Sequence, residues 1–304
     1  MFSIRSHVRV VYSLSLQGYI RMYPKSAGSS KALARNLPSG LAEEDDKSPI
    51  PFEHRSGRGA GSNKSGRFER EQRERVDDGW GSLENEEALK PLKTHVTIER
   101  PKTIITRNDS PDISFDRSIN PYRGCEHGCV YCFARPTHAY MGMSPGLDFE
   151  TKLFAKEGAA DLLERELSGR NYIPKVIAIG TNTDPYQPIE RQHRIMRGVL
   201  EVLARTQHPV CIVTKSALIT RDIDILAPMA KQGLAKVALS VTTLDRRLAR
   251  SMEPRASSPD RRLEAIHQLN EAGILAGVMV ASIIPGPNHP DQVRANLRWL
   301  RTVV

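Results

Sequence analysis

The eight-residue loop Cys125-Glu-His-Gly-Cys129-Val-Tyr-Cys132 decides the fold of this chain, and it has the cysteine spacing C-x3-C-x2-C. It contains three of the four cysteines in a sequence of 304 residues. This clustering differs from the even, dispersed cysteines of a secreted disulfide scaffold. The fourth cysteine, Cys211, lies among apolar neighbours and is interpreted as a small buried hydrophobic residue. The loop therefore predicts metal ligation in a reducing compartment, which favours a cytoplasmic location.

The cysteine loop is compatible with two kinds of metal centre. Three thiolates can hold three irons of a [4Fe-4S] cluster and leave the fourth iron open for another ligand. Alternatively, the same thiolates and one imidazole, from His127 or His138, would complete a tetrahedral zinc site. Zinc modules generally separate their ligand pairs by a longer span, so the spacing favours the cluster.

Downstream of the loop, buried apolar strands alternate with amphipathic helices. Strands are predicted at 176–180, 210–214, 236–240 and 275–284, and helices at 156–167, 189–206, 222–232, 259–272 and 290–303. Upstream, 94–98 and 104–105 are predicted as short strands, and 113–122 alternates before it leads into the loop. This order predicts an α/β fold with a parallel sheet, whose ligand site lies at the carboxyl ends of the strands.

The spacing C-x3-C-x-aromatic-C resembles that of the radical S-adenosylmethionine (radical SAM) superfamily. The resemblance continues in Thr106-Arg-Asn-Asp-Ser-Pro-Asp-Ile-Ser-Phe-Asp-Arg-Ser-Ile-Asn-Pro-Tyr-Arg-Gly124 and in Cys132-Phe-Ala-Arg-Pro-Thr-His138. These segments resemble a family of uncharacterised bacterial radical SAM proteins related to the spore photoproduct lyase group. From about residue 58 to the end of the chain, the resemblance implies a partial (β/α)6 barrel of the TIM type, with SAM laid across the strand ends.

The resemblance also implies a chemistry. Cys125, Cys129 and Cys132 would ligate a [4Fe-4S] cluster whose open iron binds the methionine moiety of SAM. Reductive cleavage of SAM would give methionine and a 5′-deoxyadenosyl radical that abstracts hydrogen from a substrate. Such an enzyme needs a reducing electron donor of the flavodoxin or ferredoxin type. The relation to the lyase group points to a nucleic-acid substrate, with which the net charge of +9 agrees.

Small and polar residues follow the predicted strand 176–180, where they let the backbone approach a ligand closely. They are Thr181, Asn182, Thr183 and Asp184. The resemblance implies that this edge receives the SAM amino group, and Asp184 suits an ammonium best. The same Asn-Thr-Asp-Pro run is also ordinary turn chemistry that caps a following helix. One turn can serve both purposes.

Two residues at the next strand ends are candidates for the SAM carboxylate. Lys215 follows the predicted strand 210–214, and Ser240 closes the strand 236–240. The resemblance implies that the two hold the carboxylate together, and a lysine is a mobile cation suited to it. An exposed lysine at the start of a helix is the alternative interpretation.

The remaining candidates surround the other parts of SAM. The hydroxyl of Thr242 suits a ribose hydroxyl, and Tyr131 would pack beside the adenine. Arg255 either pairs with Glu253 or meets the methionine end of SAM. The segment Ile284-Pro-Gly-Pro287 resembles the adenine-side wall of the site.

No catalytic residue is assigned from the sequence. Lyases of the related group carry a hydrogen-donating cysteine just before a Thr-Ser-Asp-like stretch, and Thr181 stands at that position here. A threonine has no thiol to donate hydrogen. Spore photoproduct repair by the known route is therefore not expected, unless Cys211 or an aromatic residue replaces the missing donor.

The composition divides the chain into two regions. Residues 1–93 are predicted to form a largely disordered basic arm, in which Arg58 to Arg67 is a solvated, Gly-rich linker or, alternatively, a phosphate- or RNA-contacting segment. Residues 94–304 are predicted to form the barrel. Its expected strands end near Tyr122, Gly180, Thr214, Ser240 and Ile284, so a sixth strand has no residues left and the barrel would lack its last strand.

Two other classes of protein remain open at this stage. A zinc- or iron-sulfur-containing nucleic-acid-binding protein would use the basic arm as an electrostatic contact without catalysis. A redox-sensing protein would hold the cluster without binding SAM. No membrane association is expected, because no apolar run reaches the roughly 18 to 20 residues that a membrane helix needs.

Overall fold

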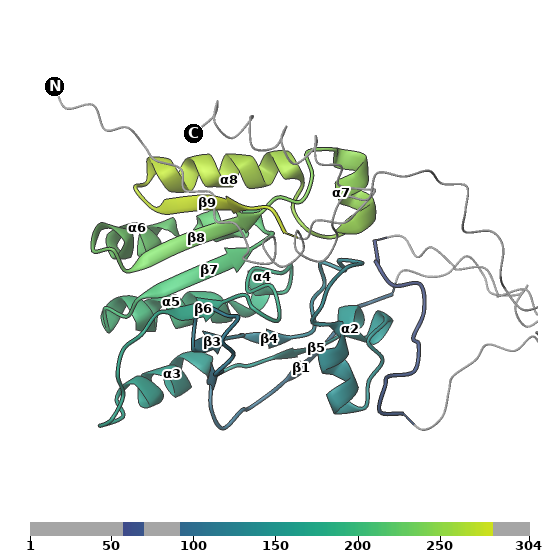
Figure 1. The fold of residues 1–304 in the computed structure, drawn as a ribbon, viewed down its shortest axis with the longest axis horizontal. Helices are drawn as coiled ribbons and strands as arrows, with labels where there is room; N and C mark the ends of the chain where they lie inside the picture. Colours follow the sequence, from purple (N-terminus) through teal and green to yellow (C-terminus); the bar gives the residue numbers. More distant parts are fainter. Residues whose placement is uncertain (1–56, 70–91, 282–304) are drawn as a thin grey trace, which may run out of the picture.

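The computed structural model describes residues 57–69 and 92–281. The predicted strand end 284–287, the predicted helix 290–303 and most of the predicted arm lie outside these residues. Two sheets and the helices packed around them make up the described part (Figure 1). The strands are β1 (His95–Ile98), β2 (Ile105–Arg107), β3 (Arg117–Ile119), β4 (Tyr122–Arg123), β5 (Lys152–Ala155), β6 (Ile177–Ile179), β7 (Val210–Thr214), β8 (Ala235–Ser240) and β9 (Leu275–Met279). The helices are η1 (Arg135–Met141), α2 (Leu147–Thr151), α3 (Ala159–Leu167), α4 (Glu190–His193), α5 (Ile195–Arg205), η2 (Ala217–Asp222), α6 (Ile223–Lys231), α7 (Arg246–Met252) and α8 (Pro259–Glu271).

The larger sheet carries the parallel strands that the sequence pattern predicts. Its order is β2-β3-β6-β7-β8-β9, and the five strands from β3 onward pair in parallel. Only the edge strand β2 is antiparallel to its neighbour. The apolar side chains of these strands and of the helices between them form one continuous core. The α/β class is confirmed, with mixed rather than purely parallel sheets, and the six-unit barrel stays a prediction.

A second, three-stranded sheet departs from the predicted pattern. It has the order β1-β5-β4, so the predicted strand 94–98 lies outside the parallel sheet. Strand β5, which follows α2 directly, was not predicted, because its four residues are too few to show the alternation of a strand. The predicted strand 113–122 is divided into β3 and β4, because Pro121 between them has no N–H for a ladder.

The predicted helices occur with altered boundaries. The segment 189–206 contains two helices, because Arg194 adopts a φ of 50° between α4 and α5. The segment 156–167 becomes helical only at Ala159, after Gly158 with a φ of 79°. The predicted helix 222–232 corresponds to α6, with η2 before it, and α8 lies within one residue of its predicted bounds.

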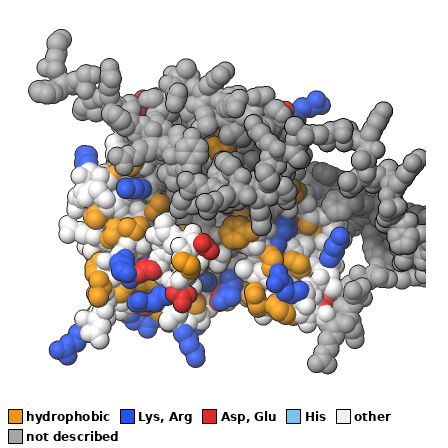
Figure 2. All heavy atoms as spheres, viewed as in Figure 1, with side chains coloured by type: hydrophobic (Ala, Val, Ile, Leu, Met, Phe, Trp, Pro, Cys, Tyr) orange, Lys and Arg blue, Asp and Glu red, His pale blue; other side chains and the backbone are white. Residues whose placement is uncertain are grey.

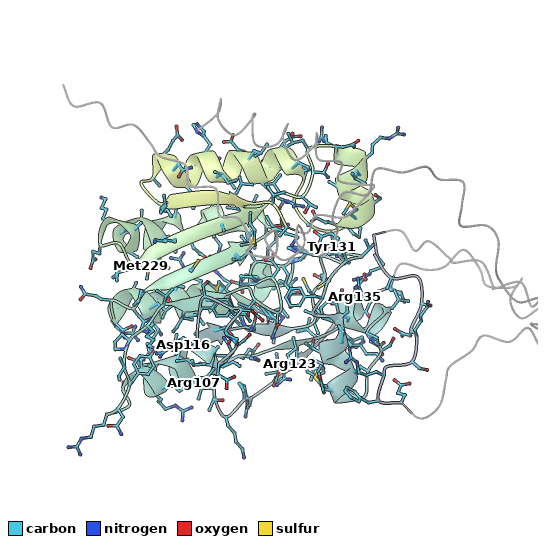
Figure 3. All side chains as sticks on the ribbon, in the orientation of Figure 1. Arg107, Asp116, Arg123, Tyr131, Arg135 and Met229 are labelled. Carbon is cyan, nitrogen blue, oxygen red and sulfur yellow. The ribbon has the colours of Figure 1, made fainter. Side chains whose placement is uncertain are left out.

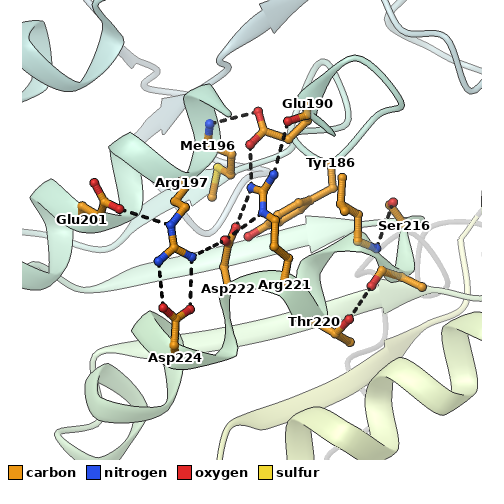
Figure 4. Close-up of polar contacts among 12 residues, drawn as sticks. Tyr186, Glu190, Met196, Arg197, Glu201, Ser216, Thr220, Arg221, Asp222 and Asp224 are labelled. Carbon is orange, nitrogen blue, oxygen red and sulfur yellow. Dashed lines mark hydrogen bonds and ion pairs between the residues drawn. The ribbon is translucent and has the colours of Figure 1, made fainter. Parts of the chain in front are cut away.

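A buried charge network fixes the helices that follow β6 and β7 (Figure 4). Arg221 donates to the carboxylates of Glu190, at 2.7 Å, and of Asp222, at 2.8 Å, and both carboxylates are fully buried. Arg197 on α5 bridges Asp222 and Asp224 from the other side. The network therefore holds η2, which follows the end of β7, against α4 and α5.

The segment 57–69 packs against the folded domain, so the prediction of a solvated linker is wrong for these residues. Arg58 is buried and donates hydrogen bonds to the carbonyl oxygens of Glu150 and Leu92. Asn63 exchanges hydrogen bonds with Asp148. Composition alone suggests an open chain, but the glycines let this backbone lie directly against the folded domain. Among the described residues, no helix is long and apolar enough to cross a bilayer.

Candidate active site

The cysteine loop begins directly after β4 and lies at the carboxyl edge of the parallel sheet. Gly124, with a φ of 74°, turns the chain from β4 into the loop. The N–H of Cys125 donates to the carbonyl of Phe149, and the N–H of Cys132 donates to the carbonyl of Cys129. Gln187 fixes the entrance, because its amide bonds the carbonyl of Gly124 and the N–H of Glu126.

The three thiols of the loop are close enough for their charges to interact. Cys125 and Cys129 are 7% and 8% exposed, and Cys132 is partly exposed. Burial raises the pKa of Cys125 well above its ordinary value, and the charges of Asp184 and of the other two cysteines add to the effect. Burial also raises the pKa of Cys129 to about 12, although nearby Lys215 opposes that rise. A cationic iron centre would offset this cost by binding the thiolates.

Three thiols are the donor set that a [4Fe-4S] cluster with one open iron would use. A cluster takes each thiolate on a different iron, whereas zinc needs its four donors around one point. Within 57–69 and 92–281, no group of three or more His, Cys, Asp or Glu side chains is already arranged to hold a metal ion. His138 instead bonds the carbonyl of Lys152 through Nε2, and Nδ1 of His127 lies 3.4 Å from Asp184.

Asp184 joins three parts of the site. Its Oδ1 accepts hydrogen bonds from the Thr214 hydroxyl at 2.7 Å and the Tyr186 N–H at 2.9 Å. Its Oδ2 accepts from the N–H of Lys215 at 2.7 Å and faces His127 of the cysteine loop. Burial by itself would raise the pKa of Asp184, but His127 and the hydrogen bonds outweigh burial and hold it well below its usual value. The carboxylate is therefore ionised and already surrounded by protein donors.

Lys215 presents a protonated amine beside the cysteine loop. Its Nζ lies 5.7 Å from the centroid of the Tyr131 ring. Burial lowers the pKa of Lys215, but the charges of Cys129, Glu253 and Asp184 more than compensate and raise it. None of the described carboxylates lies within 4 Å of this amine, as an ion pair would require. The structure thus places a partly buried cation, which pairs with none of the described carboxylates, where the resemblance implies a ligand carboxylate.

The ion-pair partner of Glu253 in the structure is Arg262 and not the predicted Arg255. The carboxylate of Glu253 pairs with Arg262 of α8 and accepts the hydroxyl hydrogens of Tyr131 and Thr242. Arg255 instead lies 3.5 Å from Glu126 in the cysteine loop. Glu253 and Arg262 are both almost completely buried, whereas the side chain of Arg255 is partly exposed.

The hydroxyls predicted at the end of β8 lie together. Ser240 donates to the carbonyl of Ala281 at 3.1 Å, and the hydroxyl of Thr242, whose hydrogen goes to Glu253, lies 3.3 Å from the same carbonyl oxygen. Arg262 fixes the strand end by donating to the carbonyl of Ser240 at 2.7 Å. In Figure 3, Tyr131 lies near α7.

Asn120 organises the turn that follows β6. Its side-chain oxygen accepts the N–H of Asn182 at 2.9 Å and of Thr183 at 3.4 Å, and its amide donates to the hydroxyl of Thr181 at 3.1 Å. Thr183 is buried and donates to the carbonyl of Tyr122. Asn182 remains exposed. Asn120 was not predicted, and its only signal is its place between the ends of β3 and β4.

The structure brings most predicted site residues to one edge. The cysteine loop, Tyr131, Asp184, Lys215 and Thr242 are linked by the contacts described above, and Thr181, Asn182 and Thr183 form the turn before Asp184. Ser240 is buried and bonds the carbonyl of Ala281, and Arg255 contacts the cysteine loop through Glu126. The sequence did not indicate three supporting residues, Asn120, Gln187 and Arg262, because their partners are distant in the chain.

The site thus combines a parallel α/β sheet with a three-cysteine loop and a partly buried lysine at the carboxyl edge of that sheet. Residues 119–300 match the model of the Radical SAM superfamily. This match covers more than half of the chain, which therefore belongs to the radical SAM superfamily, whose enzymes use a [4Fe-4S] cluster and SAM.

Individual relatives agree with this membership. An uncharacterized protein of Mycobacterium tuberculosis is 40% identical over 185 residues, which are 60% of this chain and 54% of that protein. An uncharacterized protein of Methanocaldococcus jannaschii is 29% identical over 168 residues, 55% of this chain and 60% of that protein. The chain thus spans about half the length of the mycobacterial relatives that it matches.

The fold is also similar to that of a solved enzyme. A spore photoproduct lyase variant with bound AdoMet and dinucleoside spore photoproduct gives a TM-score of 0.51 at 19% identity. The similarity covers 68% of this chain and 56% of that chain. It supports the α/β radical SAM fold and carries no information on the substrate of this chain.

Proposed function

We propose that this chain is a radical SAM enzyme that binds a [4Fe-4S] cluster through Cys125, Cys129 and Cys132 and binds SAM across the strand ends. Bound there, the cluster and SAM supply reductive cleavage to methionine and a 5′-deoxyadenosyl radical that abstracts hydrogen from a substrate. The protein binds and orients both groups and excludes water from them.

The observation that carries the proposal is the amine of Lys215. Lys215 is partly buried, and a cation that pairs with none of the described carboxylates is costly there unless a ligand supplies the opposite charge. The carboxylate of SAM has that charge, and Lys215 lies between Tyr131 of the cysteine loop and the end of β7. We assign the SAM carboxylate to Lys215, with Ser240 as its predicted second partner.

The other SAM contacts follow from position. Thr181 and Asn182 are accessible at the turn after β6 and are assigned to the amino group with the backbone of Thr183. Asp184 is assigned to positioning this turn, because protein donors already occupy both of its oxygens. Tyr131, Thr242 and Arg255 are assigned to the adenosine and methionine ends as the resemblance implies.

The substrate and the wider architecture belong to the same proposal. We propose a partial (β/α)6 barrel over residues 94–304, completed on one side by the packed segment 57–69, and an electron donor of the flavodoxin or ferredoxin type. A nucleic acid is the proposed substrate class, by relation to the lyase group. Figure 2 shows basic side chains interspersed with acidic and hydrophobic ones on the visible face, so the net charge alone does not locate a nucleic-acid path.

Anaerobic reconstitution tests the proposal directly. The reconstituted protein is expected to contain about four irons per chain and to release 5′-deoxyadenosine when dithionite and SAM are added. Zinc in place of iron, or an intact cluster that never cleaves SAM, would overturn it in favour of a zinc protein or a redox sensor.

A pair of variants tests the assignment of Lys215. SAM is expected to change the EPR spectrum of the reduced cluster in the wild-type protein. Lys215→Ala should retain iron but lose this change, because the carboxylate has lost its cation. Lys175→Ala is the matched control, since Lys175 is largely exposed and pairs with Asp116 far from the loop. An unaltered SAM response in Lys215→Ala would remove the assignment.

A further inference from the structure

Glu150 of α2 is a fully buried carboxylate with no role in the SAM site. Its Oε1 accepts hydrogen bonds from the N–H of Ala60 at 2.9 Å and from Arg135 at 2.6 Å. Its Oε2 accepts the N–H of Gly59 at 3.1 Å. A buried carboxylate surrounded by donors from two distant segments fixes those segments relative to each other.

Arg135 extends these contacts to a cluster cysteine. The guanidinium donates twice to the carbonyl of Cys129, at 2.9 and 3.2 Å, while it is ion-paired with Glu150. It lies on η1, immediately after the cysteine loop, and Figure 3 shows it on the side of α2. Glu150 therefore fixes the arginine that holds the backbone of Cys129.

Residues 58–60 lie directly against the same loop. A Cβ atom on Gly59 would approach the carbonyl oxygen of Gly128 to 1.8 Å, so only glycine fits there. Arg58 contacts the hydroxyl of Thr94, and Thr94 in turn donates to Glu126 inside the loop. The loop is thus covered by a segment that precedes it by more than 60 residues.

We infer that Glu150 is a positioning residue for the iron-sulfur cluster, because it joins residues 58–60 and Arg135 around the backbone of Cys129. The inference rests on the proposed function. It assigns to the Gly-rich segment a part in cluster retention, in place of a contact with nucleic acid.

The charges around Glu150 predict the direction in which the midpoint potential of the cluster should change. In the native protein, Glu150 neutralises Arg135 beside the loop. Glu150→Gln leaves the guanidinium charge uncompensated, and an added positive charge stabilises the more negative, reduced state of a nearby cluster. The midpoint potential of the cluster should therefore move to a more positive value. The loosened loop should also lose its cluster about 10-fold faster to a chelator, as is typical when a supporting contact of a metal ligand is removed.

Asp148 provides a matched control on the same helix. It is also buried, and it holds the same segment through Asn63 at 3.0 Å while accepting the N–H of Ser144, just before α2, at 3.1 Å. It has no described contact with the cysteine loop. Asp148→Asn should therefore weaken the segment without changing the cluster potential, whereas a merely structural role for both carboxylates predicts the same change in both variants.

The experiment uses the full chain and compares wild type, Glu150→Gln, Asp148→Asn and Gly59→Ala. Cluster loss and midpoint potential are measured on reconstituted protein, and the alkylation rate of Cys129 relative to Cys211 is measured on the apoprotein. Faster loss in Glu150→Gln and Gly59→Ala, a positive potential shift in Glu150→Gln and faster Cys129 alkylation support the inference. Circular dichroism verifies folding, and if Glu150→Gln does not fold, Gly59→Ala decides, because it keeps every charge.

Two other outcomes are distinguishable. A wild-type protein that never assembles a cluster overturns the proposed function, and the alkylation of Cys129 then decides the inference alone. A cluster that assembles normally, with Glu150→Gln equal to Asp148→Asn in loss rate, potential and alkylation, overturns the inference and leaves the proposed function intact.

Discussion

Asp184 accepts the backbone N–H of Lys215 at 2.7 Å, and this hydrogen bond joins the end of β6 to the end of β7. The same oxygen faces His127 in the cysteine loop. One carboxylate thus sets the position of the lysine assigned to SAM relative to the loop assigned to the cluster.

Replacing Asp184 with asparagine should loosen this junction. The amide cannot accept on both atoms, so either the N–H of Lys215 or the hydroxyl of Thr214 loses a charged partner. We expect the free energy of unfolding to fall by about 1.5–3 kcal/mol and SAM affinity to fall with it. Urea unfolding and SAM titration measure the two effects. Asp224→Asn, at an exposed pair with Arg197, should change neither, and equal behaviour of the two variants would contradict the junction.

Gly180 should tolerate no side chain. It has a φ of 93°, and a Cβ atom there would lie 2.1 Å from the carbonyl oxygen of Val213. Gly233 also has a positive φ, of 72°, but a Cβ atom on it meets nothing within 4 Å. Gly233→Ala should cost about 1–2 kcal/mol from backbone strain, and Gly180→Ala about 1–3 kcal/mol more from overpacking. Chemical unfolding of both variants checks the difference, and equal losses would show that the strand end can move.

Substituting Arg262 and Arg255 in turn tests which of the two arginines pairs with Glu253. Arg262→Met leaves the Glu253 carboxylate buried without its cation, so it should destabilise the fold by about 3–5 kcal/mol. Arg255→Met removes only the longer, partly exposed contact with Glu126 and should cost less than about 1 kcal/mol. Thermal unfolding ranks the two variants. The reverse order would restore the pairing of Glu253 with Arg255.

The sequence predicts the parallel sheet well because its signal is local. β7 has its predicted bounds and α8 lies within a residue of its own, since apolar runs and helical periods are visible within single segments. β5 has only four residues, too few to show a period. The packing of residues 57–69 depends on Glu150 and Asp148, about 90 positions away, and no local pattern reveals it.

The same distinction applies to the site. Cysteines, a lysine and hydroxyls at strand ends were predicted because residue type and position together suggest their chemistry. Their supports were not, because a partner is chosen by packing rather than by proximity in the chain. Arg255 is two residues from Glu253, yet the carboxylate pairs with Arg262 of the following helix.

His208 should make the fold sensitive to mild acid. Burial lowers the pKa of His208, the hydrogen bond to the Pro209 carbonyl opposes this, and the nearby charge of Arg117 lowers the pKa further. The pKa of His208 therefore stays below its ordinary value. With Nδ1 donating to Pro209, Nε2 accepts the Tyr172 hydroxyl at 2.7 Å, and protonation of Nε2 would require this hydroxyl to turn its hydrogen away. The unfolded chain binds a proton near pH 6.5, whereas the folded chain does so only at lower pH. The free energy of unfolding should therefore fall as the pH drops from about 7 to 5. His208→Gln should flatten this slope in urea titrations, while His267→Gln, at an exposed position, should keep it. An unchanged slope in His208→Gln would show that His208 is not the titrating group.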